Sequence, residues 1–67
     1  MPLYWEDAED IAEALLEAHP QQDPTEVCFP TLHRMICELP DFADEPRRSS
    51  EGKLEAIRLA WHAQVTP

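Results

Sequence analysis

The first clear pattern along the chain is a repeat of apolar residues at helical spacing over about residues 7–18. The apolar positions of this segment are Ala8, Ile11, Leu15 and Ala18. Asp7 stands at the N-cap position, and Asp10 occupies the capping-box position. His19 and Pro20 follow, and a residue that precedes proline avoids the helical conformation. The pattern therefore predicts an amphipathic helix over this segment.

Two further segments show the same spacing. The second helix is predicted over about residues 31–39, with Pro40 stopping it and with an apolar stripe of Leu32, Met35, Ile36 and Leu39. The third helix should start at Ser49 or Ser50, which are good N-cap residues. Its apolar face consists of Leu54, Ile57, Trp61 and Val65. The last residues, Thr66 and Pro67, should fray.

Short elements are expected between and before the helices. Asp23 and Pro24 are typical of the N-cap and first residue of a single helical turn. Val27 and Phe29 then alternate as a very short strand, which we expect to pair with the equally short stretch 3–5. Three helices with such a rudimentary β-ribbon predict a small, mostly-α, three-helix domain of modified winged-helix-like arrangement, although periodicity alone does not fix the topology.

The segment DFADEPRRSS between the second and third helices is predicted to be a loop. Phe42 is its only large apolar residue, so we expect this side chain to anchor the loop to the core. Trp5 and Trp61 are also assigned to the core, because a small domain needs large aromatic side chains to bury enough apolar area. Leu59 departs from the apolar face of the third helix, and it either contacts a partner or packs against the N-terminal segment.

The length and net charge of the chain limit the classes of function that it can have. The chain has 67 residues, enough for one domain (1–67), and a core of this size leaves no room for an enclosed active site. Fourteen Asp and Glu against five Lys and Arg give a formal net charge of -9, which disfavours nucleic acid and anionic lipid as partners. The N-terminal stretch lacks the features of an export signal. We therefore expect a cytoplasmic, monomeric protein that is not an enzyme.

The cysteine and histidine residues give weaker signals. Cys28 and Cys37 match no zinc or redox spacing, and they are interpreted as free thiols. The alternative is a thiol that takes part in sulfur chemistry of a partner. His33 lies beside the apolar stripe, and no carboxylate or cysteine is assigned to it at a spacing typical of metal ligands. We therefore interpret it as a partly buried, hydrogen-bonded side chain.

The first helix carries an unusual concentration of negative charge. Glu6, Asp10, Glu13 and Glu17 project within an arc of about 60° on a helical wheel, with Glu9 beside them. We call these five residues the acidic ridge. Carboxylates one turn apart can hold ferrous iron or another hard divalent cation weakly, together with water. The plainer alternative is a solvated helix face.

A second acidic group follows the second helix. Asp41, Asp44 and Glu45, which we call the acidic loop, either extend the ridge, form a separate docking surface, or serve the turns of a polar loop. Arg47 and Arg48 stand close to them in the sequence and are too few for a nucleic-acid site. We expect these two arginines to pair with their acidic neighbours at the surface.

Several motifs in fixed order resemble the IscX (YfhJ) family of iron-sulfur cluster assembly proteins. They are WEDAEDIAEAL, the DP turn at residues 23–24, LHRMICEL, DFADEP and SSEGKLEAIRLAW, and together they cover nearly the whole chain. The resemblance implies a modified winged-helix fold, surface binding of Fe2+ through acidic side chains, and docking on the cysteine desulfurase IscS. It also implies modulation of cluster assembly alongside frataxin, in competition for the desulfurase.

Carried over by position, the resemblance assigns two overlapping sets of residues. The candidate metal residues are Glu6, Asp10, Glu13 and Glu17. The candidate partner-binding residues are Glu9, Glu13, Glu17, Asp41, Asp44 and Glu45. The leading interpretation is a small acidic adaptor that regulates the desulfurase, and the alternative is an iron donor to the nascent cluster.

Overall fold

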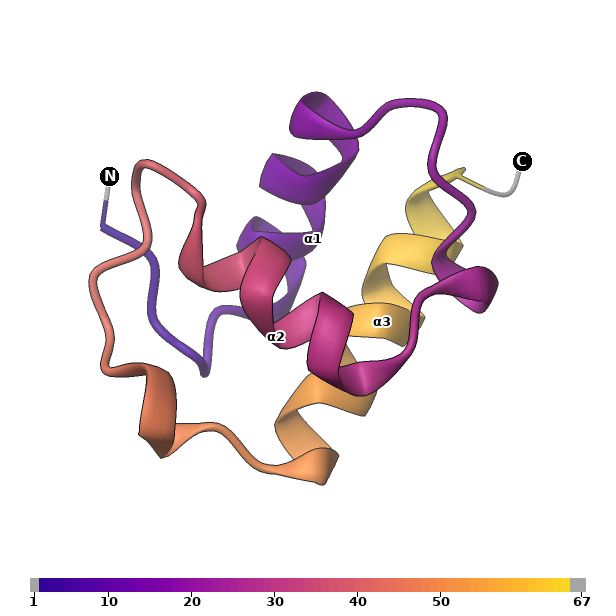
Figure 1. Ribbon diagram of the computed structural model, residues 1–67. Coiled ribbons are helices and arrows are strands. Elements are labelled where there is room, and N and C mark those ends of the chain that lie inside the picture. The colour runs from indigo at the N-terminus through magenta and orange to yellow at the C-terminus, as the bar shows by residue number, and fades with distance from the viewer. Residues whose placement is uncertain (1, 66–67) are drawn as a thin grey trace.

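Three α-helices dominate the computed structural model, which describes residues 2–65. They are α1 (Ala8–Ala18), α2 (Phe29–Cys37) and α3 (Glu51–Val65), and single 3-10 turns, η1 (Pro24–Glu26) and η2 (Pro46–Arg48), precede α2 and α3. Helices α1 and α3 pack against each other most extensively, and α2 contacts both (Figure 1). The predicted mostly-α class with three helices is therefore confirmed. Thr66 and Pro67, which we expected to fray, lie outside the described residues.

Helix α1 forms where the apolar repeat predicts it. Its sequence, AEDIAEALLEA, consists almost wholly of good helix formers, and its inner face buries Ile11, Ala12 and Leu15 completely. The helix ends as expected: the backbone N–H of His19 donates to the carbonyl of Leu15 at 2.8 Å, and Pro20 follows. The packed face is opposite the charged one, so the core fixes which way the acids point.

The start of α1 differs from the prediction. Asp7 occupies the N-cap position but makes no side-chain cap, because its Oδ2 accepts a 3.0 Å hydrogen bond from the backbone N–H of Tyr4. The predicted capping box with Asp10 is therefore wrong. The backbone N–H of Asp7 also donates to the carbonyl of Tyr4 at 2.9 Å, which closes a turn before the helix. Glu6 lies in this turn and not on the helix.

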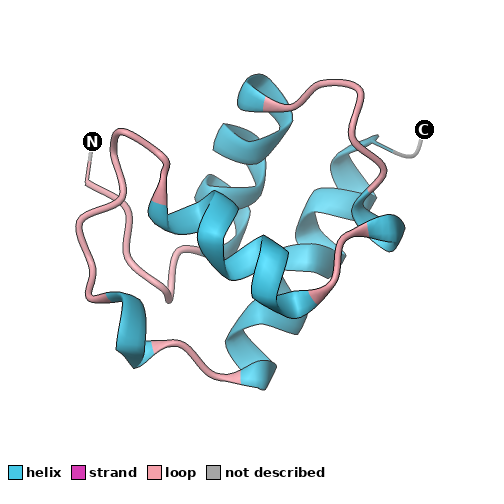
Figure 2. Ribbon diagram, viewed as in Figure 1, coloured by secondary structure: helices cyan, strands magenta, loops and turns pink. Residues whose placement is uncertain are grey.

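The predicted β-ribbon is wrong. Phe29, which we expected in a strand, begins α2, because Pro30 suits the first turn of a helix. Leu3 pairs instead with Phe42 in an isolated parallel bridge. Two 2.8 Å hydrogen bonds form it, from Leu3 N–H to the Asp41 carbonyl and from Ala43 N–H to the Leu3 carbonyl. Residues 2–65 form no sheet, and the winged-helix-like detail is not confirmed (Figure 2).

The core contains most of the residues that the helical stripes predict, whereas Ala8 and Val65 are only partly buried and Ala18 is exposed. Leu32, Met35, Ile36 and Leu39 are buried from α2 and the turn after it, and Leu54, Ile57 and Trp61 are buried from α3. The Oγ of Ser50 accepts from the backbone N–H of Lys53 at 3.3 Å, so Ser50 caps α3 as expected. Leu59 is 60% exposed, which leaves it available for a partner contact.

Trp5 joins the N-terminal segment to the loop after α2. Its side chain is 1% exposed, and its Nε1–H donates to the carbonyl oxygen of Glu45 at 2.7 Å. Phe42 meets the Trp5 ring edge-on, with the ring centroids 4.8 Å apart. The prediction that Phe42 anchors the loop to the core is thus confirmed, and in Figure 1 the loop runs beside the N-terminal segment.

The two buried tryptophans make a matched pair for a stability test. Trp5 and Trp61 are both buried, but the indole N–H of Trp61 has no acceptor within the described residues. Replacing either residue by phenylalanine removes the same volume, whereas only Trp5→Phe also breaks a hydrogen bond. We expect Trp5→Phe to lower the free energy of unfolding by about 1 to 2 kcal/mol more than Trp61→Phe. Urea denaturation of both variants measures the difference, and equal losses would contradict it.

Candidate functional site

All the acids of the ridge are exposed. Glu9, Asp10, Glu13 and Glu17 project from α1 into solvent, and Glu6 is exposed in the turn before it. Within residues 2–65, no ion pair involves any of them. Within this part of the chain, direct pairing with cations therefore does not neutralise their charges.

The acidic loop lies against the ridge at both ends of α1. At the C-terminal half of the helix, Glu17 and Asp41 line one hollow in the surface. Near the N-terminus, Glu6 lines a second hollow with Asp44 and Glu45. Asp41 thus shares a hollow with one acid of the ridge, and Asp44 and Glu45 share a hollow with another. We call the combined surface the acidic face.

The second hollow contains positive charge as well. Its lining residues are Tyr4, Glu6, Ala43, Asp44, Glu45, Arg48 and Lys53. The carboxylates of Glu6, Asp44 and Glu45 therefore share this hollow with two of the protein's own cations, Arg48 and Lys53. The first hollow is lined by Leu3, Ala14, Glu17, Ala18, Leu39, Pro40 and Asp41, so no cation reduces its negative charge. The two ends of the acidic face therefore differ in how strongly they should attract a positive group.

The carboxylate of Asp44 helps to hold the acidic loop in place. Its Oδ2 accepts from the backbone N–H of Trp5 at 3.1 Å, and its Oδ1 accepts from the N–H of Glu45 at 2.8 Å. The hydrogen bond from Trp5 is the main reason that the pKa of Asp44 lies below its usual value, with Glu45 and the nearby Arg48 acting in the same direction. Only 14% of the Asp44 side chain is exposed, so it offers a partner little surface.

The other loop acids remain accessible. Glu45 pairs with Arg47 at 3.8 Å, but 64% of the Glu45 side chain is exposed, and such surface pairs contribute little. Arg48 lies 3.9 Å from Asp44, so the predicted pairing of both arginines with acidic neighbours is confirmed. Asp41 is exposed, and only its backbone carbonyl takes part in the loop's hydrogen bonds.

The acidic face contains no ready-made chelating site. Within residues 2–65, no group of three or more His, Cys, Asp or Glu side chains is arranged to hold a metal ion. The ridge acids on α1 are nevertheless hard oxygen donors spaced one turn apart. These donors fit weak binding of ferrous iron by two carboxylates completed by water, and they do not fit a tight, enclosed site.

His33 has a neighbour that the sequence interpretation missed. Its Nε2 lies 2.7 Å from the carbonyl oxygen of Pro46, which only accepts, so Nε2 carries the proton. In the neutral ring, Nδ1 then accepts from the thiol of Cys37, 3.8 Å away. Cys37 is one helical turn after His33, and that spacing could have revealed the contact. His33 also stacks on Trp5, so the expectation of a partly buried, hydrogen-bonded histidine is confirmed.

Both cysteines are free thiols, as predicted. Burial raises the pKa of Cys37, and the nearby Glu38 acts in the same direction, so this thiol is kept protonated. Cys28 is exposed, and the hydroxyl of Thr31, 3.2 Å from its Sγ, lowers the pKa of Cys28. Neither thiol has the general base and the depressed pKa together that nucleophilic catalysis uses.

Three arginines of the described residues face aromatic or acidic groups of the protein itself. The guanidinium of Arg58 lies over the ring of Phe29, 5.0 Å from its centroid, and Arg47 and Arg48 face acids of the loop. No helix among the described residues has the length and apolar content needed to cross a membrane.

The comparisons with known proteins agree with these observations. A family model described as iron-sulphur cluster assembly matches residues 3–66. The chain is also 49% identical over 61 residues to an uncharacterized protein of Pseudomonas aeruginosa, which covers 91% of this chain and 92% of the relative. The three-helix fold and the match to the family model together define a small iron-sulfur cluster assembly protein. The chain belongs to the IscX (YfhJ) family, as its motifs indicate.

Because the carboxylate of Asp44 accepts backbone hydrogen bonds that hold the loop, we expect the stability of the fold to depend on pH. Because its folded-state pKa is depressed, the ionised carboxylate stabilises the fold above the unfolded value of 3.8, and this stabilisation is lost as the pH falls through the lowered pKa. Asp44→Asn should therefore lower the urea midpoint at neutral pH, and the difference from the wild type should shrink in strong acid. Asp41→Asn is the matched control and should leave the midpoint unchanged. A difference that grows on acidification would contradict this role.

Proposed function

We propose that this protein is a non-catalytic cytosolic adaptor that regulates iron-sulfur cluster assembly by docking its acidic face on the cysteine desulfurase IscS. The observation that carries the proposal is the acidic face itself, in which Glu17 and Asp41 line one hollow at one end of α1, and Glu6 and Glu45 line another at the other end. An exposed surface with such an excess of carboxylates suits a basic groove on a partner. Membership of an assembly family supplies the class of partner.

The mechanism we propose is electrostatic competition. Exposed carboxylates without internal ion pairs attract a basic surface over about 8 to 10 Å at physiological ionic strength. Frataxin would compete for the same basic surface of the desulfurase. Because Asp44 holds the loop together, we assign docking to Glu9, Glu13, Glu17, Asp41 and Glu45 and leave Asp44 a supporting role.

Charge reversal on the ridge tests the docking. Glu13→Lys combined with Glu17→Lys should weaken binding to the desulfurase by about tenfold at low salt, chiefly through slower association, because long-range steering is strongest there. Both side chains are exposed, so the fold should be retained. Surface plasmon resonance at several salt concentrations measures the association rate.

A matched control exists on α3. Glu51 and Glu55 are also exposed and one turn apart, but they line neither hollow of the acidic face. Reversing both to lysine makes the same change in net charge and should affect binding much less. Equal effects of the two double variants would mean that only net charge matters, and the docking surface would be wrong.

Iron binding gives a separate prediction. We propose that Fe2+ is held weakly by the ridge, through Glu6, Asp10, Glu13 and Glu17, because two neighbouring carboxylates and water can satisfy a hard cation. Adding ferrous iron to labelled protein should broaden the NMR signals of Glu13 and Glu17 first. Broadening centred on His33 and Cys37, with the ridge signals still sharp, would place the metal at the thiol-imidazole pair instead.

The alternative function is an iron donor to the nascent cluster. The lack of a three-ligand group within the described residues favours weak binding, which permits handover. A reconstitution assay at limiting iron separates the two functions. Iron preloaded on this protein should reach the cluster no faster than free iron if the protein is a regulator, and faster if it is a donor.

A further inference from the structure

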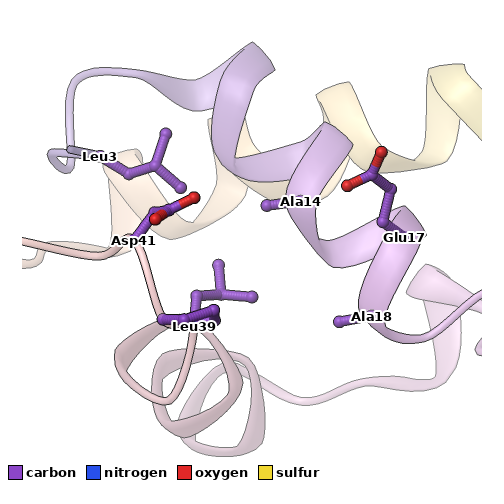
Figure 3. A pocket seen from close by; sticks show the side chains of 7 residues that line it. Leu3, Ala14, Glu17, Ala18, Leu39 and Asp41 are labelled. Carbon is purple, nitrogen blue, oxygen red and sulfur yellow. The ribbon is translucent and has the colours of Figure 1, made fainter. Parts of the chain in front are cut away.

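The hollow between the C-terminal half of α1 and the acidic loop has an apolar floor and two acidic walls (Figure 3). Its volume is about 240 Å³. That is below the range of about 300 to 1,000 Å³ typical of pockets for drug-sized molecules. A single side chain is a better match for a space of this size.

Small residues on α1 form the floor. Ala14 and Ala18 are one turn apart, and because neither extends beyond Cβ, the helix surface between them is open to the hollow. Leu3 and Leu39, both 6% exposed, complete the apolar lining from the N-terminal segment and the end of α2. These apolar side chains can contact methylene groups, but they offer no hydrogen-bond partner to a hydrated ion.

Two carboxylates form the walls. Glu17 and Asp41 stand on opposite sides of the hollow in Figure 3. Asp41 is held in place because its carbonyl accepts the 2.8 Å hydrogen bond from the N–H of Leu3. Neither carboxylate has a hydrogen-bond or ion-pair partner among residues 2–65, whereas the second hollow is shared with Arg48 and Lys53.

We propose that this hollow receives an arginine side chain from the basic protein partner on which the acidic face docks. The inference rests on the proposed function and deepens it by naming the anchoring group. The methylene stem would lie on Ala14 and Ala18, and the guanidinium would donate to Glu17 and Asp41. A guanidinium is planar, weakly hydrated and rich in donors, so it suits two carboxylates on facing walls better than a compact ammonium group does.

A direct titration tests the ligand chemistry without any partner. We expect N-acetyl-arginine amide to shift the backbone NMR signals of Ala14, Ala18 and Asp41 in the labelled full chain, with saturation. The neutral isostere N-acetyl-citrulline amide should not shift them. Shifts of equal size along the whole acidic face, or equal shifts with citrulline, would overturn the proposal.

Filling the hollow provides a variant that keeps every charge. Ala18→Leu places a larger side chain in the hollow and should weaken binding of the arginine amide by about tenfold or more. Ala56→Leu makes the same change at an exposed position of α3 and should have no effect. Unchanged binding by Ala18→Leu would overturn the proposal. Circular dichroism checks the fold, and Glu17→Gln with Asp41→Asn provides a second test, which should also weaken binding.

Binding to the desulfurase separates this inference from the proposed function. If the wild type binds, Ala18→Leu should raise the dissociation constant about tenfold while Ala56→Leu leaves it unchanged. Wild-type binding that Ala18→Leu does not alter would overturn the arginine anchor and leave the proposed function standing. If the arginine amide binds in the hollow but the desulfurase does not bind at all, the ligand chemistry is supported and the proposed function is overturned.

Discussion

Trp5 is buried, and its Nε1–H donates a 2.7 Å hydrogen bond to the carbonyl of Glu45, a residue 40 positions later in the chain. The backbone N–H of the same tryptophan donates to the carboxylate of Asp44. Both contacts hold the acidic loop against the segment that leads into α1. They fix Asp44 and Glu45, which line the second hollow of the acidic face, beside the segment before α1.

The acidic face is thus assembled against its own electrostatic repulsion. A formal net charge of -9 on 67 residues disfavours compaction, and the ion pairs of the loop, at 3.8 and 3.9 Å on the surface, offset little of it. Contacts that do not depend on paired charges hold the loop instead: the indole of Trp5, the ring of Phe42, and backbone hydrogen bonds to Leu3. Among residues 2–65, Glu17 and Asp41 therefore have no ion-pair partner and remain accessible.

Local sequence patterns predicted the helices because apolar residues recur at helical spacing along segments of 9 to 15 residues. The alternation of Val27 and Phe29 was too short to separate a strand from the start of a helix, and Pro30 suits a helix start. The exposed acids of α1 could be predicted from spacing alone, whereas Glu6, which lies in the turn before the helix, could not. The hollow that Glu17 and Asp41 both line could not be predicted, because Asp41 is placed by the Leu3 bridge, a contact between distant parts of the chain.

Glu17 belongs both to the ridge proposed to hold iron and to the hollow proposed to hold an arginine. A cation bound between Glu13 and Glu17 would occupy the Glu17 carboxylate, which could then no longer accept hydrogen bonds from the partner's arginine. A guanidinium bound to Glu17 would in turn remove one ligand from the metal. Thermodynamic linkage makes such coupling reciprocal, so iron must weaken docking by the same factor by which docking weakens iron binding. A single shared carboxylate would therefore make docking of this adaptor depend on the iron supply, with no conformational change required.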